Sequence, residues 1–319
     1  MKNKKILITG CAGFIGSNLS DVLLTNNQVI GIDNLSTGQE KFMSSSIKNK
    51  NFTFHKFDLL DKASLIDVSK NIDIVIHLAA NADVRDGINK PTIDLEQNTI
   101  VTSNVLESCR INNIKEFMFS STGSIYGNHK TIPTPEDAQF PIQTSLYGAS
   151  KLACEGMISA YSEAYRIKSW MFRFVSIVGE RYSHGHIFDF YKQLSKNPEE
   201  LFVLGDGNQK KSYLYIQDCL NAIIHSYSNI SNEINIINLG YDDYITVKDS
   251  IGFICEELSL EPNLKFAGGE SGWGGDNPYI HLDTNKITKS GWNPKLSIKE
   301  GVQRTVRYLQ TNEWLFKKR

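Results

Sequence analysis

A glycine-rich turn near the N-terminus constrains the fold of this chain more than any other feature. The apolar run Lys5–Thr9 leads into Gly10, Gly13 and Gly16, and a helical pattern extends from Phe14 to about Leu24. Between a strand and a helix, such glycines permit a tight turn and a close approach to a pyrophosphate, which the helix amides would face. The pattern predicts a dinucleotide site, although a glycine triplet by itself also fits a tight turn without a ligand.

An acidic residue follows at the distance that such a site requires. Asp33 ends the next predicted strand, Gln28–Asp33, and stands 20 residues after Gly13. A carboxylate there accepts hydrogen bonds from both adenosine-ribose hydroxyls and repels a 2′-phosphate. Because no arginine follows within Asn34–Gly38, the sequence favours NAD over NADP. Taken alone, Asp33 would more often be a loop acid that caps a turn.

The first half of the chain alternates predicted strands with predicted helices. Ile72–Leu78 is almost entirely apolar, as in a strand that is buried on both faces. Such alternation implies right-handed crossovers and an α/β fold with a doubly wound parallel sheet covered by helices. Further strands are predicted at Phe52–Lys56, Phe117–Ser120, Ser169–Phe174 and Ile234–Leu239, and helices from Asp61, after Pro91 and over Tyr147–Arg166.

In the second half of the chain, predicted strands and helices no longer alternate regularly, so a smaller lobe is expected there. We assign residues 1–179 and about 213–240 to a dinucleotide-binding domain. Residues of about 180–212 and 241–319 are assigned to a discontinuous, mixed α/β substrate lobe, with a helix near His186–Leu194.

The composition argues against several classes of function. The 34 Lys+Arg residues nearly balance the 35 Asp+Glu residues, so a nucleic-acid binder that relies on bulk charge is not expected. No run approaches the roughly 20 apolar residues of a membrane helix, and the N-terminal apolar run is too short for a signal peptide. The five cysteines never form C-x-x-C, which predicts a reduced, cytoplasmic protein without disulfides. His184 and His186 lack partners at metal-ligand spacing, so no metal is expected.

A tyrosine and a lysine lie where they can act together. Tyr147 and Lys151 stand four residues apart on a predicted helix, so their side chains share one face. An ammonium near a phenol lowers its pKa, and the resulting phenolate can take a proton from a substrate hydroxyl while hydride leaves the same carbon. Ser120 ends a predicted strand, and Thr122 and Ser124 follow it, at the carboxyl end where open α/β sheets hold their ligands. Alternatively, Tyr147 and Lys151 are two residues of an ordinary amphipathic helix, and the segment with Ser120, Thr122 and Ser124 is a serine-rich turn.

Together these motifs resemble the extended short-chain dehydrogenase/reductase family, in its branch of NAD-dependent nucleotide-sugar epimerases and dehydratases, such as UDP-glucose/galactose 4-epimerases. The resemblance covers nearly the whole chain. It implies a Rossmann-type NAD domain, a nucleotide-diphosphate sugar as substrate, and a homodimer. The further matching segments are Asp33–Gly38, His77–Ala80, Leu204–Gly207, Tyr213–Asp218 and Gly275–Asp276.

The resemblance implies catalytic, cofactor-binding and substrate-binding roles. Thr122 would hold the sugar hydroxyl, Tyr147 would be the base, and Lys151 would bind the nicotinamide ribose. The implied cofactor-binding residues are Gly10, Gly13, Phe14, Ile15, Gly16, Asp33, Asn34, Ser36, Thr37, Gly38, Asp58, Leu59, Leu78, Ala79, Ala80, Asn98, Ser120, Tyr147 and Lys151. The implied substrate-binding residues are Thr122, Ser124, Ser176, Arg181, His186, Lys211, Trp273 and Asp276.

The chain departs from the family pattern at positions near the substrate. Gly123 and Ser124 stand where dehydratases carry an Asp-Glu pair, which disfavours 4,6-dehydration. Ser176 stands where 4-epimerases often carry asparagine, and Lys211 and Trp273 stand where the family usually places arginines. A lysine meets phosphate as a point charge and lacks the bidentate fork of arginine. The other candidate cations are Arg181, His184, His186 and Lys210.

We therefore predict an NAD-dependent enzyme that oxidises C4 of a nucleotide-diphosphate sugar to a 4-keto intermediate. A 4-epimerase would return the hydride to the other face of that intermediate. The first alternative is a 4-dehydrogenase that releases the keto sugar, for example a GDP-linked hexose or heptose for surface polysaccharide. The second is a dinucleotide-binding regulator without catalysis, which the presence of Thr122, Tyr147 and Lys151 disfavours.

Overall fold

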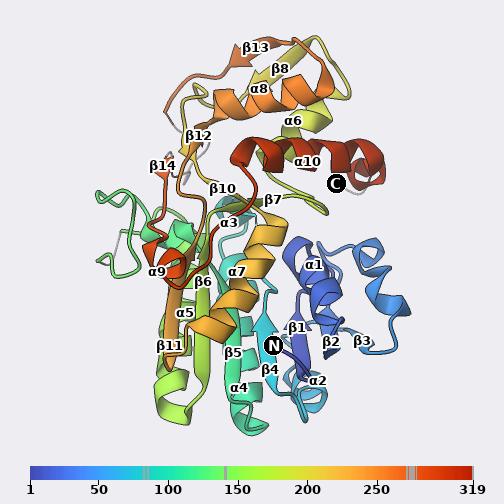
Figure 1. Cartoon of the computed structure of the whole chain (residues 1–319), viewed down its shortest axis with the longest axis vertical. Coiled ribbons are helices and arrows are strands. Elements are labelled where there is room, and N and C mark those ends of the chain that lie inside the picture. The colour runs from blue at the N-terminus through green and yellow to red at the C-terminus, as the bar shows by residue number, and fades with distance from the viewer. Residues whose placement is uncertain are drawn as a thin grey trace. The chain divides into compact units, whose positions relative to one another are not determined.

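The largest sheet in the described part of the chain has seven strands, in the order β11-β6-β5-β4-β1-β2-β3 (Figure 1). Ile6 on β1 lies opposite Val29 on β2 and opposite Ile74 on β4, and both pairings are parallel. The strand order reverses between β1 and β4, which is where doubly wound sheets hold their ligands. The predicted fold class is confirmed. The strands are β1 (Lys5–Thr9), β2 (Gln28–Asp33), β3 (Phe52–Lys56), β4 (Ile74–His77), β5 (Glu116–Thr122), β6 (Lys168–Phe174) and β11 (Ile234–Leu239).

The computed structural model describes residues 1–81, 83–84, 86–139, 142–270, 272, 277 and 279–317. The chain divides into two units, each of which has several segments. The segments of the first unit are Met1–Ile125, Ser145–Arg173 and Leu220–Ile237. Those of the second unit are Tyr126–Thr144, Phe174–Cys219 and Asn238–Arg319.

Helices cover both faces of the sheet. Figure 1 shows α1 and α7 in front of the strands, whereas α4 contacts both α2 and α5. The apolar side chains between these layers are fully buried, among them Leu7 and Phe117 from the strands and Val105 from α4. Burial of each such side chain contributes about 1.5–3 kcal/mol. The helices are α1 (Phe14–Leu23), η1 (Glu40–Met43), η2 (Ser46–Lys48), α2 (Lys62–Val68), α3 (Asp86–Asn89), η3 (Leu95–Ile100), α4 (Val101–Ile111), η4 (Gly123–Tyr126), α5 (Leu146–Tyr165) and α7 (Ile216–Asn229).

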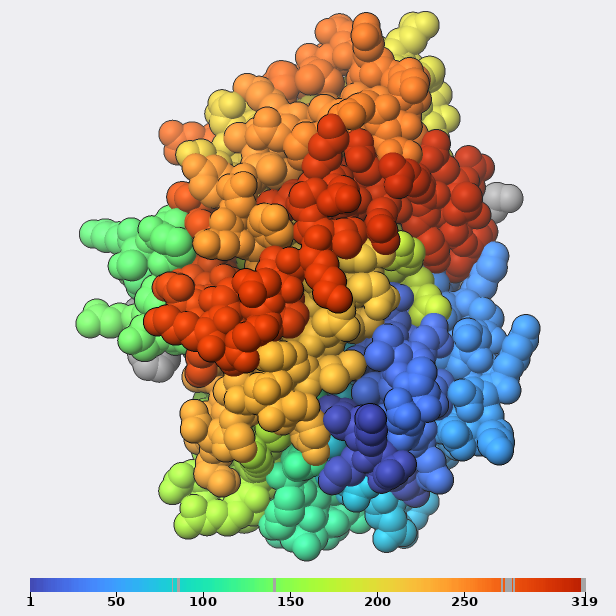
Figure 2. All heavy atoms as spheres, viewed as in Figure 1, coloured from blue at the N-terminus to red at the C-terminus, as the bar shows by residue number. Residues whose placement is uncertain are grey.

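The second unit combines small sheets with helices. Its α6, α8 and α10 pack together, and Figure 2 shows the side chains of α8 and α10 in close contact. Thr246 and Ser297 begin α8 and α10 with capping boxes, which satisfy amide groups at the helix starts. The strands are β7 (Ser176–Val178), β8 (Glu200–Val203), β9 (Lys210–Lys211), β10 (Tyr213–Tyr215), β12 (Ile245–Thr246), β13 (Asn263–Phe266) and β14 (Tyr279–Ile280). The helices are α6 (His186–Leu194), α8 (Val247–Leu258), α9 (Asn285–Lys289), α10 (Ile298–Thr311) and η5 (Glu313–Lys317).

Several elements differ in detail from the sequence predictions. The helix expected after Pro91 starts with the π-helical turn η3 and continues as α4. Strand β5 runs two residues further than predicted and ends at Thr122. The parallel pair β7–β10 was not predicted, because three-residue strands carry almost no periodic signal. Among the described residues, no helix is long and apolar enough to span a membrane.

His77 is a buried polar residue at the carboxyl end of β4. The Thr9 hydroxyl accepts hydrogen bonds from the Leu78 and Ala79 amides, so its proton points to Nδ1 of His77 at 2.6 Å. The other ring nitrogen lies 3.1 Å from Oγ1 of Thr102 on α4. Burial lowers the pKa of His77 to about 3, with a smaller contribution from the charge of Lys151. His77 is therefore neutral and ties β1, β4 and α4 together below the loop Leu78–Ala80.

Acidification should destabilise the protein partly through His77. Below about pH 6.5 the unfolded chain binds a proton at this ring, whereas the folded chain binds it only near pH 3. The free energy of unfolding should therefore fall by up to about 1.4 kcal/mol per pH unit across this window. In a variant with glutamine in place of His77, the free energy of unfolding should change less steeply with pH, by up to about 1.4 kcal/mol per pH unit. Urea unfolding between about pH 6 and pH 4 measures the slope, and an unchanged slope would contradict this account.

Candidate active site

The glycine-rich turn forms a cradle of the kind that a dinucleotide pyrophosphate occupies. Gly10 has φ of +71°, and a Cβ there would lie 2.7 Å from the backbone nitrogen of Ala79. A Cβ on Gly16 would overlap the carbonyl oxygen of Gly10. Gly13, the N-cap of α1, makes no side-chain cap hydrogen bond, and the positive end of the helix dipole, which favours an anion, lies at this position. Phe14 and Ile15 form the first turn of this helix, and the cradle fits the phosphates of NAD.

Asp33 connects the glycine-rich turn to the loop after β2. Its Oδ2 accepts a hydrogen bond from the Ala12 amide at 3.0 Å, and its Oδ1 accepts one from the Leu35 amide at 2.8 Å. Burial raises the pKa of this carboxyl, and the two amide hydrogen bonds lower it. Gly38 lies close above, because a Cβ there would be 2.8 Å from Oδ1 of Asp33. The loop thus folds over the carboxylate, and its exposed residues are Ser36 and Thr37.

A second polar pair lies beside Asp33 in the same unit. Asn34 donates from Nδ2 to Oδ2 of Asp58 at 2.9 Å. Asn104 on α4 donates from Nδ2 to the carbonyl oxygen of Leu59 at 3.1 Å. These bonds fix the loops after β2 and β3 at one edge of the sheet, where the sequence analysis placed the adenosine half of the cofactor.

Asn98 joins the loop after β4 to the start of α5. Its side chain is 1% exposed, accepts a hydrogen bond from the Asn81 amide at 2.8 Å, and donates to Oδ1 of Asp94 at 3.1 Å. It also donates to the Ser150 hydroxyl at 2.9 Å, and that hydroxyl donates to the carbonyl oxygen of Tyr147 at 2.8 Å. The predicted cofactor residue Asn98 is therefore within two hydrogen bonds of the predicted base.

The three predicted catalytic residues lie together at the carboxyl end of β5. Thr122 is the last residue of the strand, and its Oγ1 accepts a hydrogen bond from the Ser124 amide at 3.1 Å. Its side chain is also hydrogen-bonded to the phenol of Tyr147, in the first turn of α5. Lys151, one turn further along, is 2% exposed and donates from Nζ to the carbonyl oxygen of Ser120 at 2.9 Å.

Burial dominates the titration of the two ionisable catalytic residues. Desolvation raises the pKa of Tyr147 to about 12, opposed by the hydrogen bond to Thr122. Desolvation also lowers the pKa of Lys151 to about 8, opposed by Cys154, Asp94 and Glu155. The lysine keeps its charge at pH 7. The sequence analysis expected a lowered pKa for Tyr147, but in the protein without a cofactor this pKa is raised. Loss of solvation outweighs the lowering by the hydrogen bond to Thr122.

The predicted substrate residues of the second unit occupy different settings. Ser176 begins β7 with an exposed side chain, opposite Tyr213 on β10. Lys211 on β9 donates from Nζ to the backbone carbonyl of Asn277. Arg181 has a left-handed backbone, with φ of +71°, in the loop before α6. Ser176 thus supplies a hydroxyl, and Arg181 and Lys211 supply positive charges, among the residues that were predicted to bind substrate.

His186 is not the cation that the sequence analysis expected. Its Nε2 lies 2.7 Å from the Ser250 hydroxyl, and its ring centroid lies 5.2 Å from that of Tyr213 and 5.7 Å from that of Phe190. Burial, together with the charge of Lys211, lowers the pKa of His186 to about 3. The ring is neutral at pH 7 and has a hydrogen-bonded place among aromatic side chains.

The remaining candidates of the second unit are His184, Lys210, Trp273 and Asp276. His184 stacks on Tyr182 with 6.1 Å between ring centroids, and Lys210 lies over the ring of Tyr244 at 5.0 Å. Trp273 and Asp276 lie outside the described residues. Within the described ranges, no three His, Cys, Asp or Glu side chains are grouped to hold a metal ion.

Sequence analysis overlooked several buried polar residues that support the site. Glu155 follows Lys151 by four residues, so the helical spacing that selected Tyr147 and Lys151 would also have found it. Asp94 and Asn81 belong to no local pattern, because only the folded chain brings them to Asn98. The other overlooked residues are Asn104 and Arg173.

Comparisons with known proteins identify the family of this chain. Residues 6–240 match the model of the NAD dependent epimerase/dehydratase family. A crystal structure of a UDP-galactose 4-epimerase is 33% identical, with 97% of this chain and 100% of that chain covered and a TM-score of 0.87. A UDP-glucuronic acid 4-epimerase from Bacillus cereus, in complex with UDP-glucuronic acid and NAD, is 28% identical, with coverage of 96% and 99% and a TM-score of 0.89. The UDP-glucuronate 4-epimerase of Thermodesulfobacterium geofontis is 29% identical, with 98% of each chain covered.

The carboxylate of Asp33 should set the cofactor preference. NAD should bind at least tenfold more tightly than NADP, because a 2′-phosphate would face a negative charge. Replacing Asp33 by serine should narrow this preference and leave measurable NAD binding. Calorimetric titration with both cofactors tests the expectation, and equal affinities in the unaltered protein would refute it.

Tyr147 should be needed for turnover and not for binding. Replacing it by phenylalanine keeps the ring and removes the proton acceptor, so turnover should fall by roughly 10²–10⁴-fold. Binding of NAD and of the nucleotide sugar should persist in calorimetry. Near-normal turnover of this variant would mean that another group is the base.

Proposed function

The chain belongs to the NAD-dependent epimerase/dehydratase family, and we propose that it is a nucleotide-sugar 4-epimerase. The reaction oxidises C4 of the sugar to a ketone and reduces that ketone from its opposite face. The relatives named above act on UDP-linked hexoses or UDP-linked hexuronic acids, so we propose a UDP-sugar as the substrate. Within the second unit, Arg181 and Lys211 are the cations that we propose for binding a nucleotide diphosphate.

Thr122, Tyr147 and Lys151 divide the proton chemistry between them. The Ser124 amide donates to the Thr122 hydroxyl, so the proton of this hydroxyl is directed away from Ser124, toward Tyr147 or the sugar oxygen. Tyr147 takes the proton of the C4 hydroxyl and returns it after the ketone is reduced. Lys151, charged at pH 7, stabilises the phenolate and would hold the nicotinamide ribose. When bound, NAD⁺ supplies the hydride acceptor and a positive charge that favours ionisation of the tyrosine.

The residues directly after Thr122 support epimerisation over dehydration. Elimination of water from the sugar needs an acid and a base next to the oxidised carbon. Gly123 has no side chain, and Ser124 carries one hydroxyl whose pKa is far too high for either role. Thr122, Tyr147 and Lys151 therefore have the groups for oxidation and reduction at C4 and lack an adjacent carboxylate pair for loss of water.

We also propose that the protein is a homodimer, as the family resemblance implies. Leu95 and Ile100 on η3 and Leu146 at the start of α5 are 53%, 39% and 48% exposed, and these two helices contact one another. A second copy of the chain would cover these exposed apolar side chains.

The fate of a deuterium at C4 of the substrate should distinguish epimerisation from release of a keto sugar. Purified protein with NAD and a UDP-, GDP-, CDP- or dTDP-sugar labelled at C4 should give the C4 epimer with the deuterium retained. No lasting absorbance at 340 nm should build up, because the hydride is returned within the same turnover. Mass spectrometry and NMR identify the products. An unlabelled 4-keto sugar with stoichiometric NADH would replace the epimerase proposal with the 4-dehydrogenase alternative.

A further inference from the structure

Three consecutive residues of β5, Ser120 to Thr122, form hydrogen bonds with side chains on one face of α5. The carbonyl oxygen of Ser120 accepts a hydrogen bond from Lys151, and the side chain of Thr122 is hydrogen-bonded to Tyr147. Between them, Ser121 donates from Oγ to Oε1 of Glu155 at 2.5 Å. The helix residues 147, 151 and 155 are spaced four apart, so they form one stripe. The contacts of Lys151 and Tyr147 involve the predicted catalytic residues already described. The contact of Glu155 with Ser121 does not.

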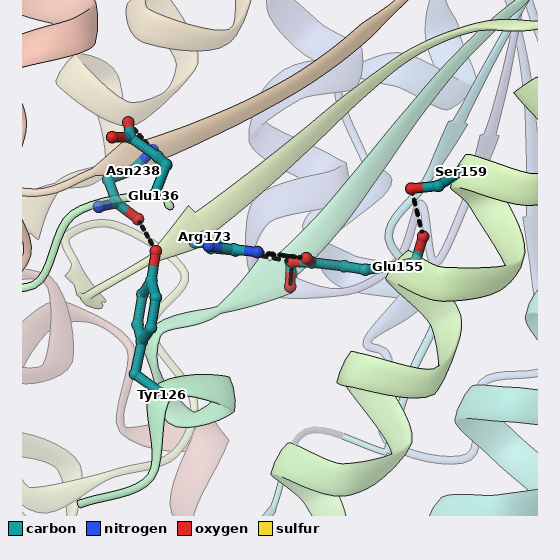
Figure 3. A network of polar contacts seen from close by, with 7 residues as sticks. Tyr126, Glu136, Glu155, Ser159, Arg173 and Asn238 are labelled. Atoms are coloured by element: carbon teal, nitrogen blue, oxygen red, sulfur yellow. Dashed lines mark hydrogen bonds and ion pairs between the residues drawn. The ribbon is translucent and has the colours of Figure 1, made fainter. Parts of the chain in front are cut away.

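Glu155 is the buried end of this stripe. Its side chain is 5% exposed and forms an ion pair with Arg173 on β6, which is 8% exposed. Arg173 donates from Nη2 to Oε2 at 2.7 Å and from Nε to Oε1 at 3.0 Å (Figure 3). Such two-point pairing fixes the carboxylate in direction as well as position. Both oxygens of Glu155 are therefore engaged, one by β6 alone and one by β5 and β6 together.

We propose that Glu155, held by Arg173, is a positioning residue that sets the register between α5 and the end of β5. A shift of the helix along the strand would move Tyr147 away from Thr122 and Lys151 away from Ser120. The fixed carboxylate opposes that shift from two turns beyond the reacting residue. The role of Glu155 in turnover rests on the proposed function, whereas its effect on Lys151 does not.

The charge of Glu155 also acts on Lys151, one helical turn away. The charged or titratable groups that influence this lysine come from α5 itself (Cys154 and Glu155), from the segment before η3 (Asp94) and from β4 (His77). Burial lowers the pKa of Lys151, and the negative charge of Glu155 raises it. Removing that charge should therefore make Lys151 lose its proton at a lower pH.

Two serine variants separate positioning from simple structural support. Ser121 donates its hydroxyl to the Glu155 side chain, and Ser159 donates its hydroxyl to the Glu155 backbone carbonyl at 2.9 Å (Figure 3). S121A should lower kcat about tenfold, with KM for the nucleotide sugar and Kd for NAD changed by less than about twofold. S159A, the matched control on the same helix, should leave kcat within about twofold. Equal kcat values for the two variants would overturn the positioning role.

A glutamine variant tests the electrostatic part without relying on turnover. E155Q keeps an acceptor for Ser121 and removes the charge, so the pH above which NAD affinity declines should be lower than in the unaltered protein. Calorimetric titration of NAD at a series of pH values measures this midpoint. An unchanged midpoint in a folded E155Q would overturn the inference, and if E155Q does not fold, the two serine variants decide it.

The two proposals fail in different ways. If the unaltered protein epimerises no nucleotide sugar, the proposed function is lost, while the comparison of NAD binding in E155Q still tests the effect on Lys151. If the protein is an epimerase and S121A behaves like S159A, the proposed function stands and the positioning role is lost.

Discussion

The contact between α5 and the carboxyl end of β5 is the constraint on which the rest of the site depends. Lys151 bonds to the carbonyl oxygen of Ser120, Glu155 to the hydroxyl of Ser121, and Tyr147 to the side chain of Thr122. A strand advances about 3.3 Å per residue, so a displacement of α5 along β5 by one residue would break these contacts. The buried pair of Glu155 with Arg173 opposes such a displacement.

The same packing sets the electrostatics of the site. Burial opposes the charged forms of both Lys151 and Tyr147, lowering the pKa of the first to about 8 and raising that of the second to about 12. The negative charges of Asp94 and Glu155 raise the pKa of Lys151 and so oppose the effect of burial on the lysine. The charge of Asp94 also raises the pKa of Tyr147 and so adds to the effect of burial on the tyrosine. The protein groups thus preserve the ammonium and leave the phenol protonated. Under the proposed function, the positive charge of the oxidised cofactor would add to that of Lys151 in favouring ionisation of Tyr147.

Many helices and strands could be predicted from the sequence because their signals are local. Apolar runs at β1, β2 and β11 and the helical pattern of α6 gave boundaries that the structure reproduces. Contacts between residues far apart in the chain were not predictable in this way. The pair Glu155–Arg173 joins positions 18 residues apart, and Asn98 reaches Ser150 across 52 residues. Neither has a spacing that a strand or helix period would reveal.

The sheet, the glycine cradle, the acid at Asp33 and the placement of Tyr147 and Lys151 on one helix face could all be inferred from the sequence. These features depend on residue type and on spacing within single elements, which backbone geometry converts directly into positions. The pKa shifts of His186, Lys151 and Tyr147 and the partners of Glu155 became known from the folded chain, because desolvation and ion pairing depend on which distant segments exclude water from a group. That information is in no short stretch of the chain.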